Sequence, residues 1–234
     1  MQGIGIGESD FKILRKKGYY FIDKTLYIKD IIDNASKVTL ITRPRRFGKT
    51  LNMSMLKYYF DCKENDSVEL FKDLKIMKQS EEYTTKMYYY PVIYITLKDI
   101  RGNNFDEMML AFQTELVEIF IEHANLLESN KLLDIEKEMF SAVLNLKANK
   151  FQSQSALKLL SRLLNKEYGS PAMLLIDEYD VPLQNAYVNG FYDESIDFFK
   201  VFYGLTFKDN PYLEKTVLSG VSRIAKESIF SRSK

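Results

Sequence analysis

The chain alternates between short apolar runs and longer segments in which apolar residues recur at helical spacing. Runs of apolar and β-branched residues predict strands at 38–42, 91–97, 172–176 and 216–220. Apolar residues spaced as on one face of a helix predict helices around 105–123, 135–147, 155–167 and 191–208. Strands that alternate with helices in this way indicate an α/β fold with a mainly parallel, doubly wound sheet.

Further elements are predicted around the first strand. Residues 19–22 have the composition of a short strand, and Thr25 is a suitable N-cap for a helix with isoleucines on one face. After residue 50, a segment of good helix formers is apolar nearly all round, so we expect it to be buried against the sheet.

The strand at 38–42 leads into a basic turn that resembles a phosphate-binding P-loop. The turn consists of Arg43, Pro44, Arg45, Arg46, Phe47, Gly48, Lys49 and Thr50. In such a loop the glycine allows close approach of a polyphosphate, and the amides at the start of the next helix point at the anion. Lys49 would reach the β- and γ-phosphates as a catalytic and binding residue, and the Thr50 hydroxyl would coordinate Mg²⁺.

The loop departs from the usual pattern at its first position, where Arg43 replaces glycine. Arginine adopts a positive φ only at a cost, so we expect the turn to differ locally or to be strained. Taken alone, the loop is also compatible with a chance Gly-Lys-Thr in an ordinary strand–turn–helix.

A second motif, at the end of the strand at 172–176, favours the nucleotide-binding interpretation. Asp177 would share in the Mg²⁺ shell opposite Thr50, and Glu178 would accept a proton from the water that attacks the γ-phosphate. A strand that ends in a solvated acidic turn is the alternative. Because this motif follows a strand–Gly-Lys-Thr–helix unit, we interpret the two together as a site for ATP and Mg²⁺.

A third group of candidate residues follows the strand at 216–220. Ser219 would read the γ-phosphate, and Arg223 would stabilise charge that develops in the transition state. A strand that simply turns through Ser-Gly remains the alternative for both residues.

Four stretches resemble the family of predicted AAA-ATPase-like prokaryotic proteins: YFIDKT at 20–25, RPRRFGKT at 43–50, IDEYDVP at 176–182 and SGVSRIAKESIFS at 219–231. The resemblance covers about 8–231 and implies a three-layer α/β/α P-loop NTPase fold over 1–234, in which Arg43 is the family's own variant. It also makes a nucleotide-side role for residues 23–25 a second interpretation beside the helix cap.

The same resemblance sets expectations for partners. Such domains are usually fused to a C-terminal nuclease domain of the PD-(D/E)XK type, and the fold needs a fifth core strand that we do not find, so we expect this chain to be incomplete at its C-terminus. The partners to consider are nucleotide, further copies of the chain, and a nuclease domain or nucleic acid through the missing part.

Composition narrows the class of protein without naming a reaction. The net charge of +1 does not favour nucleic acid as a bulk polyelectrolyte partner. The single cysteine, Cys62, excludes an internal disulfide and a cysteine-based zinc site. Neither a signal-peptide core nor about 20 consecutive apolar residues is present, so we expect a cytoplasmic protein with no membrane contact. His123 lies on an apolar helical stripe and is expected to be a core or boundary residue.

The preferred function is an ATPase whose hydrolysis of Mg²⁺-ATP drives a conformational change in an attached or partner module. The alternative is a nucleotide-dependent switch with little or no turnover. A small-molecule kinase fits the Asp177-Glu178 pair less well. Within the basic turn, we expect at least one arginine to contact phosphate. The structural alternative is that Arg45 and Arg46 are solvated or paired with acidic residues such as Asp23.

Overall fold

The computed structural model describes residues 3–64 and 68–222, and a parallel sheet runs through its centre. The strands are β1 (Val38–Thr42), β2 (Val92–Thr96), β3 (Ala172–Asp177) and β4 (Leu213–Gly220). Their order is β1-β4-β3-β2, and every neighbouring pair is parallel. The predicted α/β class with a P-loop-like three-layer arrangement is confirmed.

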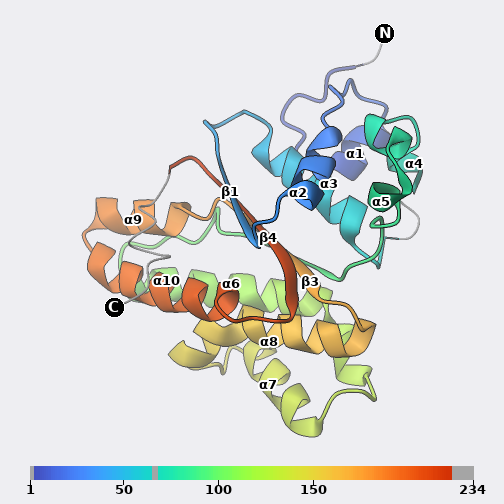
Figure 1. Cartoon of the computed structure of the whole chain (residues 1–234). Helices are drawn as coiled ribbons and strands as arrows, with labels where there is room; N and C mark the ends of the chain where they lie inside the picture. Colours follow the sequence, from blue (N-terminus) through green and yellow to red (C-terminus); the bar gives the residue numbers. More distant parts are fainter. Residues whose placement is uncertain (1–2, 65–67, 223–234) are drawn as a thin grey trace.

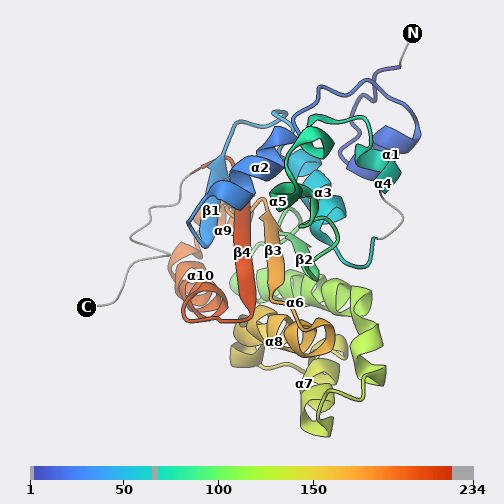
Figure 2. The same cartoon turned by 45° about the vertical axis from the view of Figure 1, so that its right-hand side comes forward.

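Helices cover both faces of the sheet (Figures 1 and 2). The first layer contains α1 (Phe11–Lys16), α2 (Leu26–Asp33), α3 (Lys49–Phe60), α4 (Val68–Phe71), the 3₁₀ helix η2 (Lys75–Lys78) and α5 (Glu81–Thr84). The second contains α6 (Phe105–Glu122), the 3₁₀ helix η3 (Ala124–Glu128), α7 (Asp134–Leu144), α8 (Lys150–Tyr168) and α10 (Tyr192–Phe207). Helix α9 (Val181–Asn189) directly follows β3.

Strand β3 shows how the sequence builds two cores from one strand. All six of its residues are buried, and successive side chains of a strand point to opposite faces. Leu174 and Ile176 belong to the core beneath α6, α8 and α10, whereas Met173 and Leu175 belong to the core beneath α1 and α3. The unbroken apolar run is therefore explained by helices on both faces.

The segment at 19–22, predicted as a strand, is extended but pairs with no strand of the described sheet. The Tyr20 amide donates to the Gly3 carbonyl at 2.8 Å, and the side chains of Tyr20 and Ile22 are exposed. Phe21 packs edge-on against Phe11 of α1. Phe21 alone anchors this segment to α1, and the segment is a loop. The prediction of a strand at 19–22 is wrong.

Other boundaries shift for identifiable reasons. Helix α8 begins five residues before the predicted start, because Asn149 caps it and Gln152 completes a reciprocal capping box. Helices α1 and α9 were not predicted; α1 is only six residues long, and α9 has Pro182 in its first turn. Helix α3 is buried as expected. His123 is 2% exposed, which confirms that it is a core or boundary residue.

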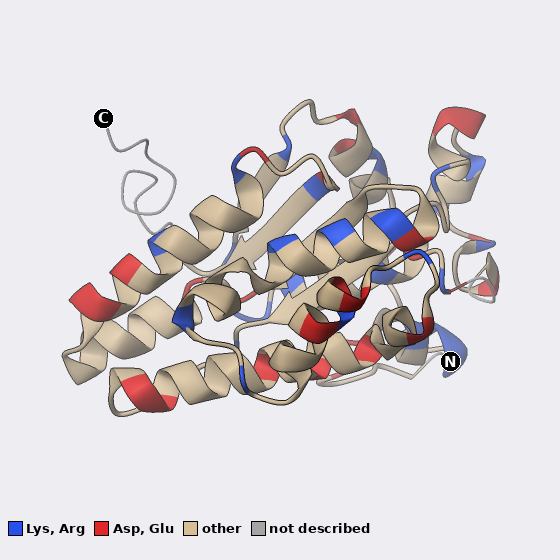
Figure 3. Ribbon diagram, turned by 90° about the horizontal axis from the view of Figure 1, so that it is seen from below, with Lys and Arg blue, Asp and Glu red and all other residues tan. Residues whose placement is uncertain are grey.

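Charged residues of both signs are interspersed over the helices in the view of Figure 3. Within 3–64 and 68–222, no helix combines the length and the apolar character that are needed to cross a bilayer.

Candidate functional site

The basic turn joins the carboxyl end of β1 to the start of α3. The Arg43 amide donates to the Gly220 carbonyl at 3.1 Å, so the backbone still follows the sheet at this residue. Positive φ occurs instead at Arg46 (66°) and at the helix N-cap, Gly48 (71°). The local difference expected from an arginine at the first position is therefore found, but the unfavourable backbone conformation falls on Arg46.

The Lys49 ammonium group lies inside the turn. Its Nζ atom donates to the carbonyl oxygens of Arg43 at 2.9 Å and Pro44 at 3.0 Å. These bonds hold the turn folded over the first residues of α3. A polyphosphate that enters the turn must therefore compete with two carbonyls for this ammonium group.

Asp177 lies at the end of β3 and links three parts of the chain. Its Oδ2 atom accepts a hydrogen bond from Thr50 Oγ1 at 2.6 Å. Its Oδ1 atom accepts from the Ser219 hydroxyl on β4 and from the Glu178 amide at 3.0 Å. Asp177 and Ser219 are each 1% exposed. The predicted ligands Thr50 and Asp177 are thus in direct contact, and the Ser219 hydroxyl is committed to the carboxylate.

Glu178 follows Asp177 with a positive φ of 53°, a conformation that is unusual for glutamate. The side chain is partly exposed, and its carboxylate has no hydrogen-bond or ion-pair partner within the described parts of the chain. The pKa of Tyr94 on β2 is raised chiefly by burial, with additional contributions from the negative charges of Asp177 and Glu178. The Glu178 carboxylate is therefore not engaged by another described residue beside the Asp177 cluster.

The turn that holds Glu178 is fixed by Asp180, which is 0% exposed. Asp180 Oδ2 accepts from the amides of Val221 at 3.0 Å and Ser222 at 2.7 Å, and from the Ser222 hydroxyl at 2.8 Å. Gln184 Nε2 donates to the same oxygen at 2.6 Å. These bonds join the end of β3 to the end of β4 beside the candidate site.

Sequence reasoning did not assign a role to Asp180. An acidic residue before a helix that has proline in its first turn reads as an N-cap, but the Asp180 side chain makes no capping bond to α9. Its partners at 221–222 lie 41 and 42 residues away, and only the adjacency of β3 and β4 brings them within reach.

The arginines of the turn are exposed, and none forms an ion pair with the described acidic residues. Asp23, suggested as a partner, accepts hydrogen bonds from Thr25 and from the Lys75 amide. Within the described residues Arg45 and Arg46 are therefore solvated and not paired with Asp23, and a contact of one arginine with phosphate stays a prediction. Arg223 lies outside the described residues.

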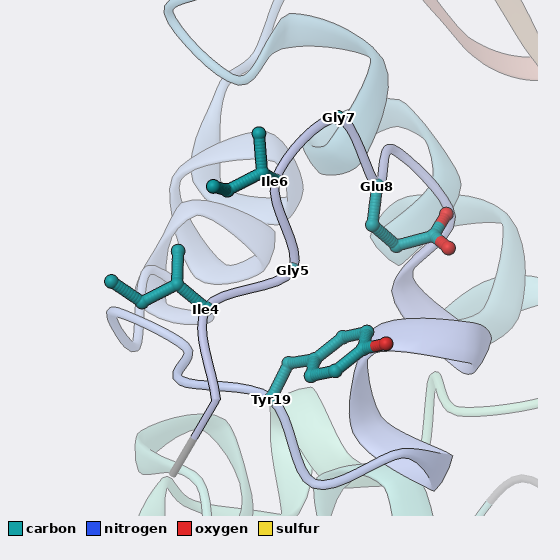
Figure 4. Close-up of a pocket in the computed structure, with 6 residues that line it drawn as sticks. All are labelled: Ile4, Gly5, Ile6, Gly7, Glu8 and Tyr19. Atoms are coloured by element: carbon teal, nitrogen blue, oxygen red, sulfur yellow. The ribbon is translucent and has the colours of Figure 1, made fainter.

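Among the clefts formed by the described residues, two are compared as candidates for ligand binding. The first, about 660 Å³, adjoins the basic turn and includes Arg43, Phe47, Lys49 and Ser219 in its lining. The second, about 430 Å³, is formed by residues 4–8 with Tyr19 (Figure 4). The Glu8 carboxylate in the second cleft accepts from the amides of Ser9 and Asp10, and the remaining lining offers little chemistry. The cleft beside the turn is the candidate reaction site.

Four parallel strands, helices on both faces and a strand–loop–helix unit at β1 and α3 define an α/β protein of the P-loop-like three-layer class. The family of predicted AAA-ATPases matches residues 4–230. The chain therefore belongs to this family, and membership is consistent with ATP binding. Neither a curated protein nor a solved structure matches the chain.

The structure gathers Lys49, Thr50, Asp177, Glu178 and Ser219 at the carboxyl end of the sheet. This edge is where open α/β sheets bind ligands, since the loops after the parallel strands converge there. The individual roles of these residues stay predictions.

Proposed function

We propose that the chain binds ATP with Mg²⁺ at the β1–α3 turn and hydrolyses the β–γ phosphoanhydride bond. The observation that carries the proposal is the 2.6 Å hydrogen bond between Thr50 Oγ1 and Asp177 Oδ2. It joins the residue after the loop lysine to an acidic strand end 127 residues away. A chance Gly-Lys-Thr has no reason to meet a buried aspartate.

The donor set suits a divalent cation of the magnesium type. Mg²⁺ prefers hard oxygen ligands, and nucleotide sites commonly supply one or two from protein with the remainder from phosphates and water. Thr50 and Asp177 provide two adjacent oxygens of this kind. When bound there, the cation would neutralise charge on the phosphate oxygens.

Binding of the phosphates falls to the turn and the first turn of α3. The N-terminal amides of this 12-residue helix and its dipole favour an anion, and Lys49 adds a mobile positive charge. In our proposal, the Lys49 ammonium leaves the carbonyls of Arg43 and Pro44 when nucleotide binds and then bonds to the phosphates. Its contacts with these carbonyls belong to the nucleotide-free state.

Glu178 is proposed to act as general base. Its carboxylate takes a proton from water as the water oxygen bonds to the γ-phosphorus and the bond to the bridging oxygen breaks, which yields ADP and phosphate. The positive φ of Glu178 supports this role, because strained backbone conformations concentrate where a side chain must be aimed. Ser219 holds Asp177 in place, and Arg223 remains the candidate for stabilising transition-state charge.

The test compares equilibrium ATP binding and phosphate release for three proteins with Mg²⁺ present. We expect Lys49→Ala to lose binding by at least tenfold, because a charge-assisted contact to phosphate disappears. We expect Glu178→Gln to bind ATP as the wild type does. Its rate of phosphate release should be about one hundredth of the wild-type rate or lower.

Unchanged binding by Lys49→Ala would remove the turn from the nucleotide site. Normal turnover by Glu178→Gln would remove Glu178 from the base role. Binding by the wild type without phosphate release would assign the chain to the alternative, a nucleotide-dependent switch. We propose that either cycle moves an attached or partner module.

A further inference from the structure

The cleft beside the β1–α3 turn extends well beyond the phosphate-binding residues. Its far wall is α2, which lies beside α3 on the same side of the sheet (Figures 1 and 2). Tyr27, Asp30 and Asn34 line it at spacings of three and four residues, which places them on one face of the helix. At about 660 Å³ the cleft falls within the roughly 300–1,000 Å³ typical of small-molecule sites.

The start of α2 is fixed by side-chain hydrogen bonds of Asp23 and Thr25 and not by a side-chain helix cap. The Thr25 side chain makes no capping bond to α2. It is 0% exposed, donates to Asp23 Oδ1 at 2.6 Å and accepts from the Ile76 amide at 3.1 Å. Asp23 Oδ2 also accepts from the Lys75 amide at 2.9 Å. This network fastens the start of α2 to η2, so the wall of the cleft is rigid at its base.

The other end of α2 is held equally well. Asn34, its C-cap, donates from Nδ2 to Thr39 Oγ1 on β1 at 3.1 Å. The Lys215 ammonium on β4 donates to the Asn34 carbonyl. Both ends of the helix are thus tied to the sheet or to η2, and the face between them is pre-organised.

Part of the lining of the cleft is apolar. Ile31 and Met53 are almost fully buried, and Tyr27 packs partly buried on the same core. Phe47, on the turn itself, lines the cleft and keeps 56% of its surface exposed. An exposed aromatic ring beside a phosphate-binding turn offers a face against which a flat ring can stack.

Charge in the cleft is divided between its two ends. Arg43 and Lys49 belong to the turn, whereas Asp30 belongs to α2, and its carboxylate has no hydrogen-bond or ion-pair partner among the described residues. Burial, with a further contribution from Asp30, raises the pKa of the Tyr27 phenol, and the positive charge of Arg43 opposes this shift. A nucleotide has the matching polarity, with anionic phosphates at one end and O–H and N–H donors at the other.

We propose that the α2 wall binds the nucleoside half of the nucleotide, with Tyr27 against the base or sugar and Asp30 accepting a hydrogen bond from a nucleoside donor. The inference rests on the proposed function and assigns the cleft-lining face of α2, with Lys24 before it, to substrate recognition. The donor is either a ribose hydroxyl or the amino group of the base, and different ligands separate the two.

The test titrates the full chain with Mg²⁺-ATP and with inorganic tripolyphosphate by calorimetry. We expect the wild type to bind ATP more tightly than tripolyphosphate. Tyr27→Ala should weaken ATP binding roughly tenfold or more and leave tripolyphosphate binding unchanged. Asp30→Asn should weaken ATP binding roughly three- to tenfold. The matched controls are Tyr20→Ala, an exposed tyrosine outside the cleft, and Asp193→Asn, an exposed carboxylate on α10.

The ligand series identifies the donor. If Asp30 bonds a ribose hydroxyl, either 2′-deoxy-ATP or 3′-deoxy-ATP binds the wild type weakly and is insensitive to Asp30→Asn. If Asp30 bonds the amino group, inosine triphosphate behaves in that way. Because Asp30 is exposed, Asp30→Asn should leave the fold intact. This variant therefore tests the inference even if Tyr27→Ala does not fold.

The inference is overturned if Tyr27→Ala and Asp30→Asn both bind ATP with wild-type affinity while Lys49→Ala loses binding of ATP and of tripolyphosphate. Equal affinity of the wild type for ATP and tripolyphosphate would overturn it too. If Lys49→Ala binds both ligands normally, the proposed function itself fails.

Discussion

At the residue scale, the turn after β3 is packed so tightly that a single methyl group would disturb it. A Cβ atom added at Gly220 would lie 2.6 Å from Asp180 Oδ1 and 2.6 Å from a ring carbon of Tyr179. Both neighbours are 0% exposed, and the Tyr179 hydroxyl donates to the Ser222 carbonyl at 2.8 Å. The glycine therefore allows β4 to approach the turn that carries Glu178.

We expect Gly220→Ala to lower the free energy of unfolding by about 1–3 kcal/mol, because buried atoms must move to admit the methyl group. The measurement is denaturant-induced unfolding. Phosphate release should fall as well, since the displaced turn carries Glu178.

Gly204→Ala is the matched control. Gly204 lies within α10, and an added Cβ meets no atom within 4 Å, so this change should stabilise the protein by about 0.5–1 kcal/mol. Equal stability of the two variants would contradict the packing argument.

At the element scale, the carboxyl ends of α3 and α6 meet in a cluster of buried titratable groups. Lys63 Nζ lies 2.7 Å from His123 Nδ1. Burial, with help from Lys63 and Lys57, lowers the pKa of His123 to about 3, and burial raises the pKa of Asp61 to about 6. The two shifts have opposite consequences for stability as the pH falls.

The sign for each group follows from which state binds more protons. Below about pH 6.5, unfolded His123 binds a proton that the native residue does not, so its contribution to the free energy of unfolding falls by about 1.4 kcal/mol per pH unit. Between pH 6 and 3.8, native Asp61 binds the extra proton, so its contribution rises. We expect the two contributions largely to cancel there.

The variant His123→Asn retains an acceptor for Lys63 but does not titrate. As the pH is lowered from 6 to 4, the free energy of unfolding of the variant minus that of the wild type should rise by about 1.4 kcal/mol for each pH unit. Denaturant melts across this range provide the measurement, and Asp61→Asn should give a difference of opposite slope. A difference that does not depend on pH would show that His123 titrates normally.

At the scale of the whole molecule, the candidate site is assembled from strands that belong to both cores. Strands β1, β3 and β4 each contribute a residue or loop to it, while α3 starts in the site and ends in the core. A ligand that bridges these elements in the native state, and does not bind the unfolded chain, should stabilise the entire sheet.

We therefore expect Mg²⁺-ATP at about 100 times its Kd to add about 2.7 kcal/mol to the free energy of unfolding. For a chain of this size each kcal/mol raises the melting temperature by roughly 2–4 °C, so the shift should be roughly 5–10 °C. Thermal unfolding with and without ligand measures it. Lys49→Ala is the control: at the same ligand concentration a tenfold loss of affinity leaves about 1.4 kcal/mol, so its shift should be about half that of the wild type or smaller. An equal shift would place the ligand elsewhere.

Much of the architecture follows from local sequence. The run at 172–176 is apolar at every position, so it had to be a strand covered on both faces, and structure bears this out. The long helix at 105–122 is predicted by the helical spacing of its apolar residues. The segment at 19–22 misled because aromatic residues have strand propensity whether they pair with a strand or anchor a loop.

The candidate site divides in the same way. Gly48, Lys49 and Thr50 could be found in the sequence because phosphate binding needs particular residue types at fixed spacing within one turn. The contact between Thr50 and Asp177 could be guessed only by combining two partial motifs. The hydrogen bonds of Asp180 and the place of α2 beside the cleft could not be found, since their partners are distant in sequence.

The sequence by itself determined the parallel α/β class, the basic turn and the acidic strand end, because each depends on interactions among neighbouring residues. Only the tertiary structure decided that the backbone strain falls on Arg46 and that Ser219 bonds to Asp177. It also decided that α2 faces the turn across a cleft. Those features depend on strand order and on hydrogen bonds between residues tens of positions apart, and no local pattern encodes either.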